Sequence, residues 1–426
     1  MNFLFIAGIN RSGGSLLARL FDGHKDFLSY PMEVRFRFDK TSYGFIDKIT
    51  GTPTYIPEFN KEYDPIKYFE AEKEIVNYEW GKEISSKHGI RKNYLEKAYY
   101  ENFLNTDFNY DYYIKKLIEY CSNCNSNQEF FEGKHKAFFE SWDNGKYFFK
   151  SKYVVTHDSN GLFLSNFDNY FADFKNSFVF IPIRDCLGYV AAEKTRIARR
   201  FFGSKRFSKP LPPNILIKKF NYYDLESIIR SWQISISRIK LLQEKHRSNK
   251  RLITYKFEKL TEDPEMTMNF FANILSIEFE KTLTKPTLCG KDWLGNSQQG
   301  KSFGIKRNPN DYFEEVLTKE EIFRINEKTY QLTSEIKQLK SVDINLTDLG
   351  DNLFFDISNQ RKSSKNKYSW SLYCSLGFSG FRKLKLNKPN YLSIIAIFFS
   401  TFVKFCHIPR LVKQKFFPGK GKQNYT

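Results

Sequence analysis

A glycine-rich run near the start of the chain combines the residue types that bind an oxyanion. It extends from Gly8 to Ser15 and reads Gly-Ile-Asn-Arg-Ser-Gly-Gly-Ser. Glycines let backbone N–H groups converge on an anion, because no Cβ blocks the approach. Arg11 adds a permanent fork-shaped cation, and Ser12 adds a hydroxyl donor. These residues predict a phosphate or sulfate loop; the alternative is an ordinary strand-to-helix turn with a surface arginine.

The flanking segments are those that would hold such a loop in place. Asn2–Ala7 is a short, nearly continuous apolar run, as in strands buried on both faces of a parallel sheet. From Ser15 to Phe21 the apolar residues follow a helical spacing, so a helix would direct the positive end of its dipole at the loop. The run is not a Walker A sequence, since no Gly-Lys-Ser/Thr closes it.

Further along the chain, strand-like and helix-like segments alternate. The predicted strands are 178–183, which Arg184 and Asp185 follow, and 251–255; the predicted helices are 188–200, 227–246 and one that starts at Asp263-Pro264. Alternation of this kind predicts an α/β fold, with a central parallel sheet and helices on both of its faces.

The loop resembles the one that binds 5′-phosphosulfate in sulfotransferases that use 3′-phosphoadenosine 5′-phosphosulfate (PAPS). The family pattern is Arg-Ser-Gly-Thr-Ser/Thr-Leu, and five of its six positions match Arg11, Ser12, Gly13, Ser15 and Leu16, with Gly14 in place of Thr. The resemblance implies a P-loop-NTPase-like sheet and PAPS binding by these six residues. It also implies 3′-phosphoadenosine 5′-phosphate as the product, and no metal.

A second motif of that family binds the 3′-phosphate, through an arginine after a strand and a serine eight residues later. Arg184 matches the arginine, but the serine position falls on Ala192, which cannot donate a hydrogen bond. Three polar residues follow on the same predicted helix and are candidates to replace the serine: Lys194, Thr195 and Arg196.

Two catalytic residues follow from the same resemblance. Glu33 lies in a Glu-x-Arg similar to that of protein-tyrosine sulfotransferases, whose glutamate is the base; its alternative role is a salt bridge with Arg35 or Arg37. The lysine that stabilises the transferring group corresponds to Lys150 or Lys152, and we favour Lys150. Arg11 would share in that stabilisation. Three histidines are further candidates for the base: His24, His135 and His157.

Two later segments also resemble the family. Tyr255 to Leu260 is similar to its Tyr-Glu-x-Leu segment, and Trp293 to Ser297 is similar to a Trp-x-Gly-Asn-Ser loop, so the resemblance reaches from Asn2 to about Ile336. It places Tyr255 at the nucleotide. Residues 295–302 fit the P-loop pattern, but no strand precedes them and Pro309 prevents the required helix. Lys301 is instead expected in a loop that closes over PAPS.

Charge divides the chain of 426 residues. Residues 361–426 contain 14 Lys and Arg and no Asp or Glu, which leaves 53 basic and 48 acidic residues in 1–360. A nearly neutral body argues against nucleic acid as a partner, and the basic tail suits an anionic membrane surface. We predict a sulfotransferase domain at 1–345, with a helical insertion at about 45–145, and a C-terminal extension at 346–426. The apolar segment 389–408 of the extension is borderline for spanning a membrane; an in-plane helix or a helix docked on the body are the alternatives.

Cysteine usage predicts a reducing cytoplasm. The six cysteines form no disulfide framework, and the N-terminus lacks the basic region of a secretory signal. Cys121 and Cys124 form an isolated C-x-x-C. Two reduced surface thiols are a simpler interpretation of this pair than a metal or redox site.

The resulting expectation is a cytoplasmic enzyme, at the inner face of a membrane, that transfers a sulfuryl group from PAPS to a hydroxyl of a glycan, lipid or other small acceptor. An ATP-dependent kinase-like transferase is the first alternative. The second is an inactive, membrane-associated binding protein, which the departures at Gly14 and Ala192 favour.

Overall fold

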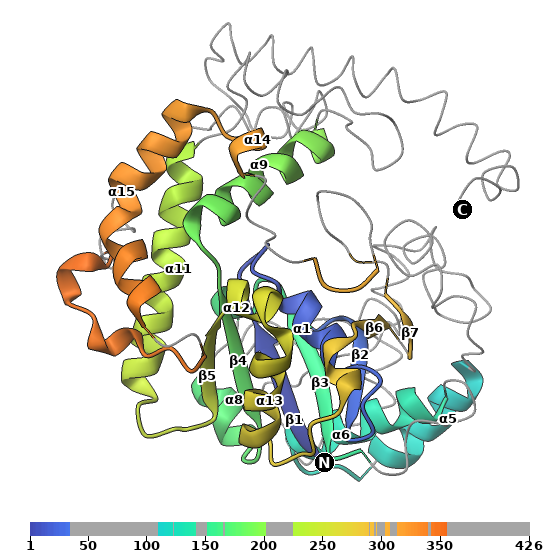
Figure 1. Cartoon of the computed structure of the whole chain (residues 1–426). Coiled ribbons are helices and arrows are strands. Elements are labelled where there is room, and N and C mark those ends of the chain that lie inside the picture. Colours follow the sequence, from blue (N-terminus) through green and yellow to red (C-terminus); the bar gives the residue numbers. More distant parts are fainter. Residues whose placement is uncertain are drawn as a thin grey trace, which may run out of the picture. The chain divides into compact units, whose positions relative to one another are not determined.

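The structure is a computed structural model (Figure 1). It describes residues 1–34, 110–121, 123–141, 151–164, 167–201, 225–288, 290–293, 295, 303–306, 313–339 and 342–355. The chain divides into two compact units. The first comprises Met1–Asp185, Arg238–Pro309 and Ser334–Asp351, and the second comprises Cys186–Ser237, Asn310–Thr333 and Asn352–Thr426.

A parallel sheet of five strands forms the centre of the first unit. Its strands are β1 (Asn2–Ala7), β2 (Phe27–Glu33), β3 (Tyr153–Asp158), β4 (Phe178–Ile183) and β5 (Leu252–Lys256). They lie in the order β2-β3-β1-β4-β5, and every neighbouring pair is parallel. The first strand of the chain is thus the middle strand of the sheet, with β3 on one side and β4 on the other.

One face of the sheet packs against α1 (Gly14–Phe21), α12 (Phe257–Glu262) and α13 (Pro264–Ile274). Leu4 and Ile6 of β1 belong to a core cluster with Leu17 and Leu20 of α1 and Phe271 of α13. Each of these side chains is fully buried, which stabilises the fold by about 1.5–3 kcal/mol apiece. This core fixes α1 against the sheet, and with it the loop that precedes the helix.

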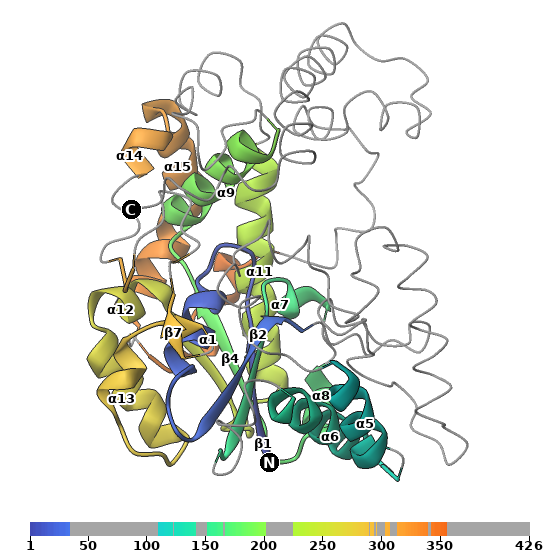
Figure 2. The ribbon, with the colours of Figure 1, turned by 90° about the vertical axis from the view of Figure 1, so that its right-hand side faces the viewer.

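The opposite face packs against α6 (Asn127–Glu140), α7 (Gly161–Leu164) and α8 (Phe167–Asp173), and Figure 2 shows α6 and α8 on the side away from α12 and α13. Because side chains alternate along a strand, Phe3 and Phe5 of β1 point to this face. The ring of Phe3 lies 4.9 Å from that of Phe131, and the ring of Phe5 lies 5.7 Å from that of Tyr170. α5 (Tyr110–Cys121) packs on α6.

The second unit contains α9 (Cys186–Phe201), α14 (Phe313–Val316) and parts of two longer helices, α11 (Leu225–Lys245) and α15 (Lys319–Gln338). Lys194 of α9 is fully buried and pairs with Glu321 of α15 at 2.7 Å. The remaining elements are η2 (Lys281–Thr284), β6 (Thr287–Leu288), β7 (Lys291–Asp292), η3 (Leu346–Asp348) and η4 (Asp351–Leu353); β6 and β7 form an antiparallel pair.

The predicted α/β class with its central parallel sheet is confirmed, and the predicted strands 2–7 and 178–183 are β1 and β4. Two strands, β2 and β3, were not predicted. β2 contains Pro31, which an edge strand tolerates because its outer side needs no ladder partner. β3 ends on the polar pair His157 and Asp158, which shortens its apolar run.

Most of the predicted insertion and extension lies outside the described residues. Within them, 110–121 and 127–140 of the insertion are helical. The basic tail from 361 onward, including 389–408, is not among the described residues. In the described part of the chain, no helix combines the length and the apolar character needed to cross a bilayer.

Candidate functional site

The glycine-rich loop lies at the carboxyl end of β1, between Ala7 and Gly14, the first residue of α1. In a parallel sheet, the carboxyl ends of all strands meet at one edge. The chain leaves β1 toward β2 on one side, and β4 lies on the other side of β1, so the loop occupies a switch point of the topology. Ligands of open α/β sheets bind at such points.

Gly13 shapes the loop where it enters α1. Its φ of +92° is in the left-handed region, which favours glycine. A Cβ at this position would also lie 2.1 Å from a ring carbon of Phe257, the first residue of α12. Only glycine satisfies both conditions, so α12 can approach the loop closely.

The first turn of α1 presents main-chain donors to the loop. The N–H groups of Leu16 and Leu17 both bond to the carbonyl of Gly13, at 3.0 and 3.2 Å. The N–H groups of Gly14 and Ser15 come before them, and the first N–H groups of an α-helix have no acceptor within the helix. Together with the helix dipole, these two donors favour an anion at this end of α1.

The side chain of Arg184 lies against the loop. It follows β4 directly, is buried, and donates from Nη1 to the main-chain carbonyl of Arg11 at 2.7 Å. Its guanidinium also lies over the ring of Phe257, 4.9 Å from the centroid. Arg11 itself has a φ of +71°, an uncommon conformation for a residue other than glycine. The bond from Arg184 therefore supports the loop where its backbone is least relaxed.

The α12 side of the site is held by Glu258. Its Oε1 accepts the main-chain N–H of Asp185 at 3.0 Å, which ties the start of α12 to the end of β4. The ring of Phe257 and the carbonyl of Arg11 thus hold the guanidinium of Arg184 between helix and loop.

The two serines of the loop differ in their roles. Ser12 is fully buried and donates its hydroxyl to the carbonyl of Ile9 at 2.5 Å, so this hydroxyl stabilises the turn itself. The hydroxyl of Ser15 lies 3.4 Å from Nε2 of His157, at the carboxyl end of β3. Of the histidines considered as bases, His157 is thus the one brought to the loop.

The predicted base Glu33 ends β2 at the same level of the sheet. Its backbone is the ladder partner of His157, and His157 is in turn the partner of Ile6 in β1. Because neighbouring strands lie about 4.8 Å apart, the Cα of Glu33 is roughly 10 Å from that of Ile6. Its main chain therefore lies at the same sheet edge as the loop; the structure does not describe its side chain.

The β3 side of the loop is fixed by hydrogen bonds. Gly8 donates its N–H to the carbonyl of Asp158 at 3.2 Å, and the side chain of Asn10 donates to that of Asn160 at 2.7 Å. Oδ1 of Asp158 accepts the N–H of Asn160 at 2.9 Å. The loop is therefore held from both neighbouring strands.

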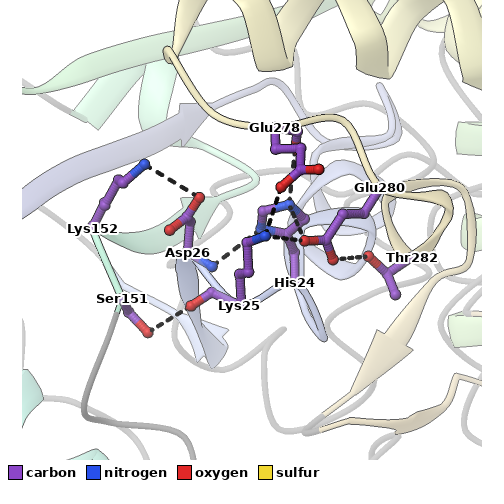
Figure 3. A network of polar contacts seen from close by, with 8 residues as sticks. All are labelled: His24, Lys25, Asp26, Ser151, Lys152, Glu278, Glu280 and Thr282. Atoms are coloured by element: carbon purple, nitrogen blue, oxygen red, sulfur yellow. Dashed lines mark hydrogen bonds and ion pairs between the residues drawn. The ribbon is translucent and has the colours of Figure 1, made fainter.

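His24 belongs to the opposite end of the sheet (Figure 3). Its Nδ1 accepts the N–H of Asp26 at 3.1 Å, so Nε2 carries the proton and donates to the carbonyl of Glu278 at 3.0 Å. Both ring nitrogens are engaged and the residue is buried, so His24 stabilises a turn at the amino end of β2.

Lys152 lies in the same network as His24, 3.5 Å from the carboxylate of Asp26 (Figure 3). It precedes Tyr153, the first residue of β3, whereas the loop lies beside Asp158, the last. At about 3.3 Å per residue, these two ends of β3 are roughly 16 Å apart. Lys152 is therefore not brought to the loop. Lys150 lies outside the described residues.

Other predicted residues occupy different surroundings. Tyr255 is fully buried in the core under α13, where its ring lies 5.2 Å from that of Phe271. Burial raises the pKa of its phenol well above the usual value. His135 is buried in α6 and its Nδ1 lies 2.8 Å from the carbonyl of Phe131. Lys301 lies outside the described residues.

Ala192 and its proposed replacements lie in α9 of the second unit. Ala192 is buried. Lys194 pairs with Glu321, Thr195 donates to the carbonyl of Ala191 at 2.8 Å, and Arg196 pairs with Glu193 at 2.6 Å. Each of the three candidate donors is thus engaged within its own unit.

Sequence reasoning did not identify Phe257 or the contact between Ser15 and His157. The feature of the sequence that could have identified Phe257 is its position directly after a strand and directly before Glu258. Among the described residues, no group of three or more His, Cys, Asp or Glu side chains is arranged to hold a metal ion.

Comparison with known proteins gives a distant structural similarity. No protein-family model matches the chain, and no curated protein matches it either. The chain is similar to the sulfotransferase domain of the olefin synthase of Synechococcus PCC 7002, with 15% identity, a TM-score of 0.40, and coverage of 77% of this chain and 94% of that one. It is also similar to a sulfotransferase domain from the curacin biosynthetic pathway, with 14% identity, a TM-score of 0.36, and coverage of 78% and 97%. Similarity at this level does not assign an activity.

Proposed function

We propose that this chain is a sulfotransferase that uses PAPS and transfers the sulfuryl group to a hydroxyl. The hydrogen bond between Arg184 and the carbonyl of Arg11 carries the proposal. The sequence resemblance assigned these arginines to the two ends of one nucleotide, from motifs more than 170 positions apart in the chain, and they lie together at the carboxyl edge of the sheet.

The donors at this edge suit an anionic nucleotide. Main-chain N–H groups of Gly14 and Ser15, the guanidinium of Arg11 and the dipole of α1 would bind the 5′-phosphosulfate. Arg184, whose Nη1 donates to the loop, would bind the 3′-phosphate with its guanidinium. The resemblance implies contacts with the nucleotide for Tyr255, Ala192 and Lys301, and these contacts stay expectations. Tyr255 has no exposed surface with which to contact the nucleotide.

Sulfuryl transfer needs charge stabilisation and one proton acceptor. The acceptor hydroxyl attacks sulfur as its proton passes to a base, and the bond from sulfur to the bridging phosphate oxygen breaks. Arg11, the loop N–H groups and, by resemblance, Lys150 would stabilise the charge that develops on that oxygen. Glu33 is our candidate for the base, because β2 ends at the same edge of the sheet as the loop. His157 is the second candidate because of its contact with Ser15.

An ATP-dependent transferase is the second candidate, and one observation favours it. Asp158 ends the strand beside β1 and lies next to Gly8, where a carboxylate could bind a magnesium ion. Against it, the loop has no lysine with which to bind the β- and γ-phosphates of ATP. An inactive binding protein is the third candidate, on the grounds of Gly14 and Ala192.

The activity is tested with PAPS and a panel of hydroxyl acceptors, with glycans and lipids first. We expect release of 3′-phosphoadenosine 5′-phosphate that depends on both the acceptor and the enzyme, and loss of this release in Arg11→Ala. Arg251→Ala is the control, because Arg251 precedes β5 at the other end of the sheet. Transfer from ATP in place of PAPS would refute the proposal.

We further propose that the basic tail from 361 to 426 binds an anionic membrane at its cytoplasmic face. Its 14 Lys and Arg without any acidic residue support this, since anionic lipid attracts each nearby basic side chain by about 1 kcal/mol. Sedimentation of the full chain with anionic vesicles tests it: binding should weaken as salt is added, yet persist through the apolar segment 389–408. A chain that stays in the supernatant at low salt would contradict it.

A further inference from the structure

Cys121 and Cys124 lie at the turn between α5 and α6, and the proposed transfer reaction does not use them. Cys121 is the last residue of α5, and α6 begins three residues after Cys124, at Asn127. Both are free thiols. The turn lies in the first unit.

The backbone brings the two cysteines within the range of a disulfide. The N–H of Cys124 bonds to the carbonyl of Cys121 at 3.4 Å, the bond that closes a four-residue turn. Such a turn places its first and last Cα atoms less than about 7 Å apart, and disulfides span Cα separations of about 4.4–6.8 Å. The Cys124 thiol also lies 3.2 Å from the carbonyl of Tyr120, so it folds back toward the end of α5.

The two thiols differ in access. Cys121 is fully buried, and Gly133 of α6 lies against it so closely that a Cβ there would be 3.0 Å from its sulfur. Cys124 is half-buried. A reagent from solution therefore reaches Cys124 first, and only an intramolecular step reaches Cys121.

The pKa shifts of the two thiols also favour Cys124 as the one that reacts first. A hydrogen bond from Cys121 lowers the pKa of the Cys124 thiol, while burial and the carboxylates of Glu129 and Glu132 oppose that effect. The hydrogen bond with Cys124, and burial, raise the pKa of Cys121. The nucleophilic thiolate is thus favoured at the accessible position.

We propose that Cys121 and Cys124 form a dithiol site that small-molecule disulfides of the glutathione type oxidise to a disulfide. The Cys124 thiolate attacks one sulfur of the disulfide, whose S–S bond breaks and releases one thiolate that takes up a proton. Cys121 then loses its proton and attacks the Cys124 sulfur, which releases the second thiol. Two protein thiols are oxidised to one disulfide, and one glutathione disulfide is reduced to two glutathione molecules.

The full chain, reduced and then equilibrated in glutathione buffers of increasing oxidised fraction, tests the site. After acid quenching and alkylation, cleavage at lysine and arginine yields one peptide, 117–134, that contains both cysteines. In reducing buffer we expect this peptide to carry two alkyl groups. In oxidising buffer it should carry none, and its mass should be two hydrogen atoms below that of the unalkylated dithiol peptide. Cys186, buried in α9, is the internal control and should stay a thiol throughout.

Two matched variants distinguish the order of attack. Cys121→Ser should retain a glutathione adduct on Cys124, because no resolving thiol remains. Cys124→Ser should acquire neither an adduct nor a disulfide, because Cys121 is buried. A wild-type peptide that remains a dithiol in fully oxidised buffer would overturn the proposal, and so would a stable glutathione adduct on wild-type Cys124. Both of these results are measured on the wild-type protein, so neither depends on whether a variant folds.

Discussion

Arg184 donates a hydrogen bond of 2.7 Å to the main-chain carbonyl of Arg11, a residue 173 positions earlier in the chain. The bond joins the end of β4 to the loop that follows β1, at the edge where the strands' carboxyl ends meet. Arg11 has a positive φ, so the bond supports a strained turn as well as joining two segments. One guanidinium therefore supports the loop from the end of β4.

Arg184→Ala should weaken binding of 3′-phosphoadenosine 5′-phosphate. A hydrogen bond to a charged group contributes about 1.5–3 kcal/mol, which corresponds to a loss of roughly 10- to 150-fold in affinity, as measured by calorimetry. Arg251→Ala is the matched control. Arg251 also donates to a carbonyl, that of Phe174 at 3.1 Å, and lies over a ring, that of Phe171 at 4.9 Å, but precedes β5. Equal affinity of Arg184→Ala and the wild type would refute the assignment.

Gly13→Ala should destabilise the protein and disrupt the loop. The left-handed backbone costs an alanine about 1–2 kcal/mol, and the clash with Phe257 adds about 1–3 kcal/mol. Gly304→Ala isolates the first cost, because Gly304 also has a positive φ but no atom within 4 Å of the added Cβ. Urea unfolding should rank Gly13→Ala as the more destabilised. A second change, Phe257→Leu, should recover part of the difference; two equally stable alanine variants would contradict the close contact.

Glu33→Gln should separate proton transfer from nucleotide binding. The variant keeps the size of the side chain and removes the base, so turnover should fall by about 10²–10⁴ while affinity for 3′-phosphoadenosine 5′-phosphate stays nearly unchanged. His157→Asn is the comparison, since His157 lies 3.4 Å from Ser15. Normal turnover in Glu33→Gln together with loss of turnover in His157→Asn would move the role of base to His157.

The network at the amino edge of the sheet should contribute to stability above acid pH. A hydrogen bond from Lys25 lowers the pKa of Glu280 below its ordinary value of 4.5. A carboxylate with a lowered folded-state pKa stabilises the fold above its unfolded-state pKa, and this contribution is lost as the pH falls through the folded-state value. Glu280→Gln should therefore reduce the free energy of unfolding near neutral pH more than in acid. In a Lys25→Met background the substitution should have less effect; an unchanged effect would assign the shift to another group.

The sheet could be predicted only where the strands are continuously apolar. β1 and β4 have such runs, and the helices next to them keep a helical spacing. β2 could not be predicted, because proline is tolerated in a strand only at the edge of a sheet. Pro31 therefore argues against a strand until the order of the strands is known, and that order does not follow from the sequence. β3 could not be predicted from an apolar run, because its last two residues, His157 and Asp158, are polar although they are buried.

The loop and Arg184 could be predicted because their residue types carry the chemistry themselves. The places of His24 and Lys152 could not, since both lie before a strand and only the parallel order of β2 and β3 puts them at the far edge. The role of Phe257 depends on how closely α12 approaches Gly13, a property of packing that no spacing in the sequence encodes.

We propose that the carboxyl edge of the sheet binds an adenosine nucleotide with phosphates at both its 3′ and 5′ ends. Thermal unfolding of the full chain with 3′-phosphoadenosine 5′-phosphate, and separately with ATP and magnesium, tests it most directly. At a ligand concentration a hundred times its dissociation constant, binding stabilises the folded state by about 2.7 kcal/mol. We predict a higher melting temperature with 3′-phosphoadenosine 5′-phosphate, a smaller rise in Arg184→Ala, and none with ATP and magnesium. An equal rise with ATP, or no rise with 3′-phosphoadenosine 5′-phosphate, would contradict binding of such a nucleotide at this edge.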